Sequence, residues 1–569
     1  MKTTTVRGLA VRTPSRRFAP ARTTARTTTT RSTRCRSAEE EKTAVIVGGG
    51  PCGLAAAMML AKEGYDRVDV IEKRKSVDYF EPDKAFVFSI DERGQKFMQM
   101  VGALDNLKAN GVGTKNFVLS RLYPDGNVQR KELAIKDDAV ENFWIPRVNF
   151  MRVLYDELVS QFSEKITVHF ESECLSIEKS ANASSEEELR VVASCKPPAS
   201  AWGLEEERVF TPTLLIGADG LRSVVREALV AWDEEGEGAG ASAGRSDFRM
   251  RKFPSLSAGL RYKVLTFPPT FLLGKGEDAG MSKHSEAYVL IGGSQKFRER
   301  IRLGLLPIHD ETAPRTANIM SASEDHELLN TKTGEGVLKF LEKSLPQLPI
   351  RQIVSPDEAQ RFAESDGARF PTPQYCRRFV KVLEGRRKSG VALVGDALHC
   401  FPPDLGQGVN SGLEDIMVLR EKMLESREDI GSALVGFQDV RLPDVKALIR
   451  LMQVGYPLQY KQYKLPALLW QMKFAMQLLV SKFLPKLFYR PPFLEVQNAS
   501  LRYRDILERL ERNCARYQVG AYAMGGLAAL WMLQRRQNYP WAIVCVAVPA
   551  LLIKFGFEKT PKELSPQSA

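Results

Sequence analysis

The sequence holds few of the residues that build metal centres or disulfide frameworks. Only eight of its 569 residues are cysteines and five are histidines. No two cysteines form a C-x-x-C pair and the histidines do not cluster, so the spacing of a zinc site and that of a small disulfide-rich fold are both missing. We therefore expect no bound metal and no disulfide framework.

Acidic residues are missing from the start of the chain. Ten arginines and lysines precede the first acidic residue, Glu39, so the rest of the chain carries a net charge of only +2 (12 minus 10). A body this close to neutrality gives no reason to expect nucleic-acid binding. The first stretch is also rich in Thr and Ser and has no apolar run, which is typical of an organelle transit peptide. We expect a transit peptide over residues 1–38, directed to the chloroplast or, as second choice, the mitochondrion; a disordered basic arm is the alternative.

No uncharged apolar run reaches the about 20 residues that a membrane-spanning helix needs. Two shorter runs near the end, Val519–Leu533 and Trp541–Ile553, flank a charged loop. With Tyr and Trp at their ends, they predict a transmembrane hairpin over residues 517–557, followed by a tail over residues 558–569. The alternative is a pair of buried core helices.

A glycine-rich turn follows the first apolar strand. Residues 43–47 read as a strand that runs into the sequence GGGPCG (48–53) and then into a helix rich in Ala, Met and Leu. Gly48, Gly50 and Gly53 have the spacing of a dinucleotide-binding turn, and the helix N-terminus would face the phosphates. Glu72 ends the second strand and is placed to accept hydrogen bonds from an adenosine ribose, with Arg74 beside the adenine.

Two further strands each deliver an aspartate into a turn. Asp219 stands in LLIGADGLRSVVR (214–226), where a buried strand meets a basic helix start. Asp396 follows the strand VALV (391–394), where it can bond a ribityl hydroxyl. Residues 406–410 then open a helix whose bare N-terminus would lie beside a flavin pyrimidine ring, where negative charge develops on reduction.

The three motifs in this order resemble the single-component FAD-dependent aromatic hydroxylases, a family that includes para-hydroxybenzoate hydroxylase and kynurenine 3-monooxygenase. The run GDALHCFPPDLGQGVNSGLED (395–415) carries the resemblance most strongly. Segments around Phe88–Gly94, Tyr262–Thr266 and Arg441–Asp444 resemble the kynurenine 3-monooxygenase branch in particular. The resemblance implies that FAD is bound by Gly48, Gly50, Cys52, Gly53, Glu72, Lys73, Arg74, Ser89, Arg147, Cys174, Asp219, Asp396, Pro403, Gly406, Gln407, Gly408, Val409 and Asn410.

The resemblance also implies an α/β architecture. We expect a Rossmann-type FAD-binding monooxygenase domain over residues 39–430, with an antiparallel substrate sheet inserted at roughly residues 256–370. A helical C-terminal region over residues 431–516 would follow.

In this family NAD(P)H reduces the flavin, which captures O₂ as a C4a-hydroperoxide and hydroxylates an aromatic ring. Because the cofactor carries the chemistry, we assign no catalytic side chain, and His399 is expected to pack beside the flavin strand.

Substrate recognition departs from the kynurenine 3-monooxygenase pattern. Phe117 stands where the family places an arginine that binds the substrate carboxylate, and Gly455 stands at a helical asparagine. Lys115, Arg121 and Tyr456 are the other candidates for substrate contact. Unless one of these compensates, we expect an aromatic or lipid substrate without an amino-acid headgroup, because an unpaired buried carboxylate is costly.

Two other functions stay open. One is a plastid flavin reductase or epoxidase that acts on a prenyl or terpenoid lipid. The other is a non-catalytic nucleotide-binding scaffold. O₂-dependent formation of a hydroxylated aromatic would separate the monooxygenase from the reductase, and a flavin-free preparation would indicate the scaffold.

Overall fold

The computed structural model describes residues 41–535 apart from residues 80, 82–83, 135–139, 182–186, 196–205, 237–245, 277–278, 295, 297–298, 322, 324, 384–388, 428 and 456–463. The expected transit peptide, the second apolar run at residues 541–553, the tail and Tyr456 lie outside the described residues. The predictions on them are therefore untested.

A six-stranded sheet forms the centre of the first domain, in the order β20-β21-β12-β1-β2-β8. All neighbours pair in parallel except β20 with β21. The strands are short, and the inner strands of the sheet are apolar and buried on both faces, as parallel strands require. They are β1 (Thr43–Val47), β2 (Arg67–Ile71), β8 (Ile166–His169), β12 (Leu214–Gly217), β20 (Val380–Leu383) and β21 (Ser389–Leu393).

Helices cover this sheet and form one hydrophobic core with it. Helix α1 is buried over Gly53–Ala61 because it packs against the sheet, α4 and α10. The helices of this domain are α1 (Pro51–Lys62), α2 (Glu92–Val101), α3 (Leu104–Asn110), α4 (Arg147–Phe162), α5 (Val224–Gly236) and α10 (Gly408–Glu425). The flavin turn contains the short helices η2 (Gly395–Ala397) and η3 (Pro403–Leu405).

Three small sheets of three strands complete the first domain, in the orders β11-β10-β9, β13-β19-β22 and β3-β7-β4. Their strands are β3 (Val87–Ile90), β4 (Val112–Gly113), β7 (Phe143–Pro146), β9 (Ser172–Ala181), β10 (Glu187–Cys195), β11 (Glu206–Phe210), β13 (Met250–Lys252), β19 (Gln374–Cys376) and β22 (His399–Cys400).

A second large sheet has seven strands in the order β18-β14-β17-β16-β15-β5-β6. Five come from the expected region: β14 (Arg261–Phe267), β15 (Ala287–Ile291), β16 (Arg302–Leu305), β17 (Arg315–Ser321) and β18 (Ala368–Arg369). The other two, β5 (Asn116–Leu122) and β6 (Val128–Ala134), come from much earlier in the chain. The strands of the expected region pair antiparallel with one another, as predicted, but the sequence did not show that β5 joins β15 in parallel.

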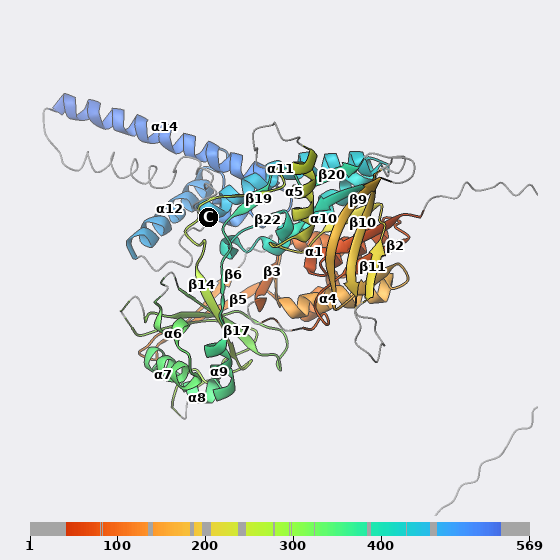
Figure 1. Cartoon of the computed structure of the whole chain (residues 1–569). Helices are drawn as coiled ribbons and strands as arrows, with labels where there is room; N and C mark the ends of the chain where they lie inside the picture. Colours follow the sequence, from red (N-terminus) through yellow and green to blue (C-terminus); the bar gives the residue numbers. More distant parts are fainter. Residues whose placement is uncertain are drawn as a thin grey trace, which may run out of the picture. The chain divides into compact units, whose positions relative to one another are not determined.

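One side of the second sheet is covered by short helices (Figure 1). Apolar side chains of the strands and of these helices form a separate core. The helices are α6 (Glu327–Asn330), α7 (Gly334–Ser344), α8 (Ile350–Ile353) and α9 (Pro356–Glu364).

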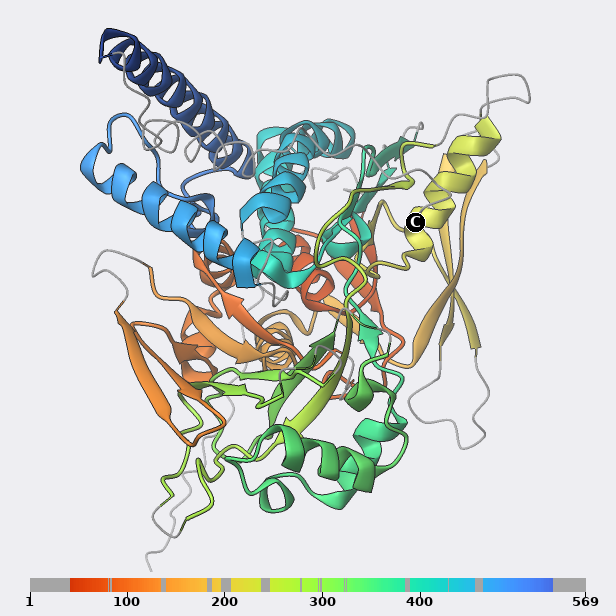
Figure 2. The ribbon, with the colours of Figure 1, turned by 90° about the vertical axis from the view of Figure 1, so that its left-hand side faces the viewer.

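The C-terminal part is helical, as expected: α11 (Ile430–Gly455), α12 (Lys464–Phe483), α13 (Pro492–Glu495) and α14 (Tyr503–Arg535). Figure 2 shows α12 and α14 as the two blue helices at one edge of the molecule. Within the described residues, no helix combines the length and the apolar character needed to cross a membrane. The transmembrane hairpin is therefore not confirmed. The alternative of a buried helix is wrong for the first run, because Val519, Leu527 and Leu530 of α14 are all more than half exposed.

Candidate active site

The first glycine turn is closed on one side and open on the other. Gly48 has a φ of +101°, and a Cβ there would lie 2.5 Å from the carbonyl oxygen of Ala218. A Cβ on Gly53 would lie 1.8 Å from the carbonyl oxygen of Gly48. In contrast, a Cβ on Gly50 would meet no atom within 4 Å. The turn therefore packs tightly against the sheet at Gly48 and Gly53 and leaves room for a ligand at Gly50, as a pyrophosphate-binding turn must.

Cys52 joins the first motif to the third. Its Sγ occupies the space that a side chain on Gly395 or on Gly412 would need, because a Cβ on these residues would lie 2.7 Å and 2.4 Å from the sulfur, respectively. Gly395 begins η2 and Gly412 lies in the first turns of α10. Since Gly48 already contacts Ala218 of the second motif, all three motifs meet around the start of α1.

Glu72 is held by the backbone of the glycine turn and by Arg74. Its carboxylate accepts hydrogen bonds from the Gly49 N–H at 2.7 Å and from Arg74 Nε at 2.9 Å, and Arg74 Nη2 donates to the Gly49 carbonyl at 2.9 Å. Burial opposes ionisation of Glu72, but its hydrogen bonds and the charge of Arg74 hold its pKa below the ordinary value. This cluster fixes an ionised acceptor at the end of β2. Lys73 between them is exposed.

Asp219 caps the helix that follows it. Its Oδ2 accepts from the N–H of Val224 at 2.6 Å, while Oδ1 has no hydrogen-bond partner in the described structure. Burial raises the pKa of Asp219 above its ordinary value. Burial raises the thiol pKa of Cys174 in β9 to about 12, and the nearby charge of Asp219 adds to this rise. One carboxylate oxygen thus serves the fold and the other is available to a ligand.

Asp396 is the middle residue of η2, just after β21. Its side chain is exposed, although its neighbours Gly395 and Ala397 are buried. Desolvation nevertheless raises the pKa of Asp396, so protein surrounds a carboxyl that solvent still reaches. This is the position in which a ribityl hydroxyl could replace solvent.

The N-terminal turn of α10 combines open backbone with anchored side chains. Gly406, with a φ of +64°, and Gly408 would each place a Cβ in open space. Between them, buried Gln407 donates through Nε2 to Asp91 Oδ2 at 2.8 Å. Buried Asn410 donates to the Ser89 carbonyl at 2.8 Å. Pro403 is exposed and Val409 is partly buried. The side chains fix the turn, and its two glycines leave open space beside the backbone.

Arg147 begins α4, with its N–H donating to the carbonyl of Phe86 at 2.9 Å. Its guanidinium pairs with Glu81 at 3.2 Å. Burial and the neighbouring charge of Arg74 lower the pKa of Arg147. Arg147 is thus mostly buried near Glu72 and Arg74, and its charge is already balanced by the carboxylate of Glu81.

His399 packs in the protein as expected. It is 1% exposed, its Nε2 lies 3.0 Å from Asp415 Oδ2, and its ring stacks on Phe401. Asp415 also accepts from buried Arg441 at 2.7 Å. Burial opposes the ionisation of Asp415, but the charges of His399 and Arg441 keep its pKa low. The histidine supports α10 and is not directed at a reacting group.

These features fit FAD. Open backbone at Gly50, Gly406 and Gly408 provides the close approach that pyrophosphate and a flavin ring need. Asp396 and the free oxygen of Asp219 provide acceptors for hydroxyl groups. Within the part of the chain that the structure describes, no group of three or more His, Cys, Asp or Glu side chains could hold a metal ion.

An aromatic cluster that the sequence did not single out lies on the second sheet. Tyr262 of β14 has its ring centroid 5.7 Å from that of Phe86 and 5.2 Å from that of Phe370. The turn before β14 connects this cluster to η3, because the Gly259 N–H donates to the Phe370 carbonyl at 3.0 Å and Ser257 donates to Asp404 at 2.6 Å. Tyr262 belongs to a segment that carries the family resemblance, but only tertiary packing brings Phe86 and Phe370 to it.

Three of the predicted substrate residues lie on or next to β5. Lys115 and Arg121 are exposed. The backbone N–H of Lys115 donates to Glu141 at 3.0 Å. Phe117 lies in β5, where its Cα pairs with that of Leu133. Lys115 and Arg121 therefore face solvent in the chain as described.

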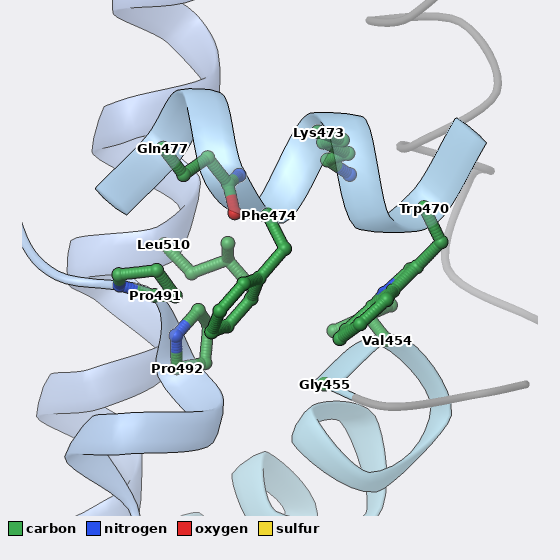
Figure 3. Close-up of a pocket in the computed structure, with 9 residues that line it drawn as sticks. All are labelled: Val454, Gly455, Trp470, Lys473, Phe474, Gln477, Pro491, Pro492 and Leu510. Carbon is green, nitrogen blue, oxygen red and sulfur yellow. The ribbon is translucent and has the colours of Figure 1, made fainter. Parts of the chain in front are cut away.

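Gly455 explains part of the departure from the family pattern. A Cβ at this position would lie 2.9 Å from Leu405 Cδ2 of η3, so Leu405 occupies the space that a longer side chain would need. Beyond Gly455, a pocket of about 340 Å³, open to solvent, is shown in Figure 3. Trp470, Lys473 and Phe474 of α12 line it, together with residues of α11, α13 and α14. Burial lowers the pKa of Lys473.

Comparison with known proteins finds an FAD-binding family model and several monooxygenases. The family model described as "FAD binding domain" matches residues 41–257 and 376–435. Kynurenine 3-monooxygenase of Salinispora arenicola is 24% identical over 480 residues, which cover 82% of this chain and 90% of that protein. The enzyme of the same name from Sus scrofa is 24% identical over 427 residues, or 74% and 77% of the two chains.

Two further proteins are similar to this chain. Violacein synthase of Chromobacterium violaceum is 23% identical over 432 residues, which cover 73% of this chain and 85% of that protein. Among solved structures, P. aeruginosa PqsL in complex with 2-aminobenzoylacetate is similar with 17% identity and a TM-score of 0.45, covering 74% of this chain and 97% of that chain. The chain is an FAD-binding enzyme that is similar to the kynurenine 3-monooxygenases over most of its length.

Proposed function

We propose that this enzyme uses NAD(P)H and O₂ to hydroxylate an aromatic ring held between the flavin turn and the cluster of Tyr262, Phe86 and Phe370. The observation that carries the proposal is the meeting of three motifs around open backbone, with that cluster tied to η3 through Ser257 and Asp404. The monooxygenase names of the relatives favour this function over a prenyl reductase or epoxidase.

Bound FAD would supply the redox chemistry, accepting hydride and activating O₂ for transfer of one oxygen atom. The protein's own part is orientation and charge. The N–H groups of the first turn of α10 favour the negative charge that develops on a pyrimidine ring placed there. The aromatic cluster excludes water from the ring to be hydroxylated. Arg147 and Arg74 add positive charge on the adenosine side.

Stopped-flow reduction of the yellow protein by NADPH without O₂ tests this proposal. A panel of aromatic and isoprenoid compounds is added, and flavin bleaching is followed. We expect an aromatic compound to accelerate bleaching and then, with O₂ admitted, to be hydroxylated. Stoichiometric reduction of a prenyl compound without O₂ would overturn the proposal in favour of a reductase.

We also propose that the aromatic substrate lacks an amino-acid headgroup. Phe117 replaces the arginine of the family pattern, Leu405 fills the space beside Gly455, and Lys115 and Arg121 are exposed. A buried carboxylate would thus lack the family's partners, which is costly. Phe117→Arg should improve kynurenine-stimulated NADPH oxidation, with Val118→Arg on the same strand as control. Efficient kynurenine hydroxylation by the wild type, reduced by Phe117→Arg, would contradict this and make Lys115 or Arg121 the clamp.

Attachment to a membrane is the third part of the proposal, and α12 supports it. Its exposed residues Leu468, Met472, Met476, Leu479 and Phe483 recur every three or four positions, so they form one stripe. Eight of the 23 large apolar side chains exposed in the described residues lie between positions 468 and 487. Such a concentration marks an interaction surface.

The charge around the stripe suits an anionic lipid surface. Between Asp444 and Glu495 the sequence has eight lysines and arginines and no acid. Of these, Lys482, Lys486 and Arg490 are exposed near the end of the stripe. An apolar face bordered by bases is typical of helices that lie in the membrane interface.

Sedimentation with vesicles tests the α12 surface. The double variant Leu479→Ser with Phe483→Ser should lose binding to vesicles that contain phosphatidylglycerol. The control is Leu424→Ser with Val435→Ser, which removes apolar side chains of similar exposure from α10 and α11. Equal binding of both variants and the wild type would contradict the proposal. Import of a fusion carrying residues 1–38 into isolated chloroplasts and mitochondria would test the proposed destination.

A further inference from the structure

The first residue of α14 reaches the flavin turn from the far end of the chain. Tyr503 is fully buried, and its hydroxyl donates a hydrogen bond to Gln407 Oε1 at 2.7 Å. The two residues are 96 positions apart. The helix that carries the first of the two apolar runs therefore begins on the turn that opens α10.

The contact continues beyond Gln407. The amide Nε2 of Gln407 donates to Asp91 Oδ2 at 2.8 Å, and Asp91 Oδ1 accepts from the N–H of Arg93 at 2.9 Å at the start of α2. The Asp91 N–H donates to Asn410 Oδ1 at 3.2 Å. One chain of hydrogen bonds thus connects α14, α10 and α2, and it holds both anchored side chains of the flavin turn.

Arg93 fixes the other end of Tyr503. Its guanidinium lies 4.1 Å from the centroid of the Tyr503 ring, and its Nε donates to the Val496 carbonyl at 2.9 Å. Arg93 is 2% exposed and also pairs with Glu414 of α10. A cation held over the ring restricts its movement, and the hydroxyl of the held ring donates to Gln407.

We propose that Tyr503 is a positioning residue for the flavin: through Gln407 and Asp91 it holds the N-terminal turn of α10 in place and so sets how easily the bound flavin is reduced. The reason is electrostatic. The N–H groups of this turn stabilise negative charge on the reduced ring only while they stay directed at it. This inference rests on the proposed placement of the flavin beside Gly406–Asn410.

Tyr503→Phe removes the hydroxyl and leaves the ring under Arg93. Gln407 then loses one partner, and the turn gains freedom. We expect the variant to bind reduced FAD about tenfold less tightly relative to oxidised FAD, which for a two-electron couple lowers the midpoint potential by about 30 mV. The flavin absorption bands should shift as well, because they report the surroundings of the ring.

Tyr517→Phe is the matched control. Tyr517 lies on the same helix, stacks on Phe488 with centroids 4.8 Å apart, and its hydroxyl has no hydrogen-bond partner among the described residues. The control variant should keep the wild-type potential and spectrum. It thereby separates the contact with Gln407 from any general effect of removing a tyrosine hydroxyl from α14.

A double-mutant cycle with Gln407→Met tests whether Tyr503 acts through Gln407. We expect Gln407→Met to lower the potential and the double variant to add no further shift. If Tyr503→Phe yields no flavoprotein, Gln407→Met alone must still lower the potential, since it breaks the same contact.

Two results would overturn the inference. One is a wild-type potential in Tyr503→Phe despite a reduced melting temperature, which would make the contact structural only. The other is additivity in the cycle. A wild-type protein that binds no FAD would instead refute the proposed function, so the two failures are distinguishable.

Discussion

Substitutions at three glycines test whether the space beside each glycine is needed for folding or for a bound ligand. Gly50 has an ordinary φ of −72°, and a side chain there meets no protein atom within 4 Å. We therefore expect Gly50→Ala to fold with the wild-type melting temperature in the absence of FAD. The added methyl group would, however, occupy the space through which a pyrophosphate approaches the N-terminus of α1.

The size of the effect follows from the contacts that would be lost. A hydrogen bond from a backbone N–H to an anionic phosphate oxygen contributes about 1.5–3 kcal/mol. Loss of one such bond weakens FAD binding about 10-fold to 100-fold, since about 1.4 kcal/mol corresponds to a factor of ten. Titration of the apoprotein with FAD, followed by flavin fluorescence, measures this directly.

Gly53→Ala and Gly304→Ala are the two comparisons. A Cβ on Gly53 would lie 1.8 Å from the Gly48 carbonyl oxygen, so this variant should lose stability, by about 1–3 kcal/mol or more, as well as FAD. Gly304 of β16 is open like Gly50 but belongs to the second sheet, so its variant should change neither. Unchanged FAD affinity in Gly50→Ala, with Gly53→Ala affecting stability alone, would refute the placement of the pyrophosphate.

Three further predictions concern the flavin turn, its buried carboxyl and the C-terminus. Asp396→Ala should weaken FAD binding by about 1–3 kcal/mol, and so lower the FAD occupancy, with the fold intact. Full flavin retention after purification would contradict this. Burial raises the pKa of Asp91 from 3.8 to about 7, so its neutral form favours the folded state below pH 4, and this stabilisation is lost as the pH rises through 7. Asp91→Asn should therefore flatten the pH dependence of the melting temperature between pH 4 and 7, and an unchanged profile would show that Asp91 does not titrate there. Deleting residues 517–569 should leave FAD bound and make membrane association sensitive to a carbonate wash, whereas association that survives the wash would mean that the anchor lies elsewhere.

Local sequence patterns were sufficient for the parts of the site that lie at strand ends. The glycine turn, Glu72, Asp219 and Asp396 each follow an apolar strand, and parallel pairing brings those ends to one edge of the sheet. The N-terminus of α10 was likewise visible from its glycines. Each of these residues could be predicted from the residues next to it in the sequence.

The rest depends on contacts between distant segments. The strands β5 and β6 join a sheet whose other strands begin more than 120 residues later, so no local pattern could show that β5 pairs in parallel with β15. Tyr503 lies 96 residues from Gln407 and reads in the sequence only as part of a charged helix. The three rings of Tyr262, Phe86 and Phe370 come from three separate segments, and only tertiary packing assembles them.

Turnover under ¹⁸O₂ tests the central claim most directly. The purified FAD-loaded enzyme is given NADPH and the aromatic compound that most accelerates flavin reduction, and the product is analysed by mass spectrometry. We predict that one ¹⁸O atom from O₂ enters the ring, with one NADPH oxidised per product. A product without ¹⁸O, or one formed equally well without O₂, would contradict the assignment of this site to aromatic hydroxylation.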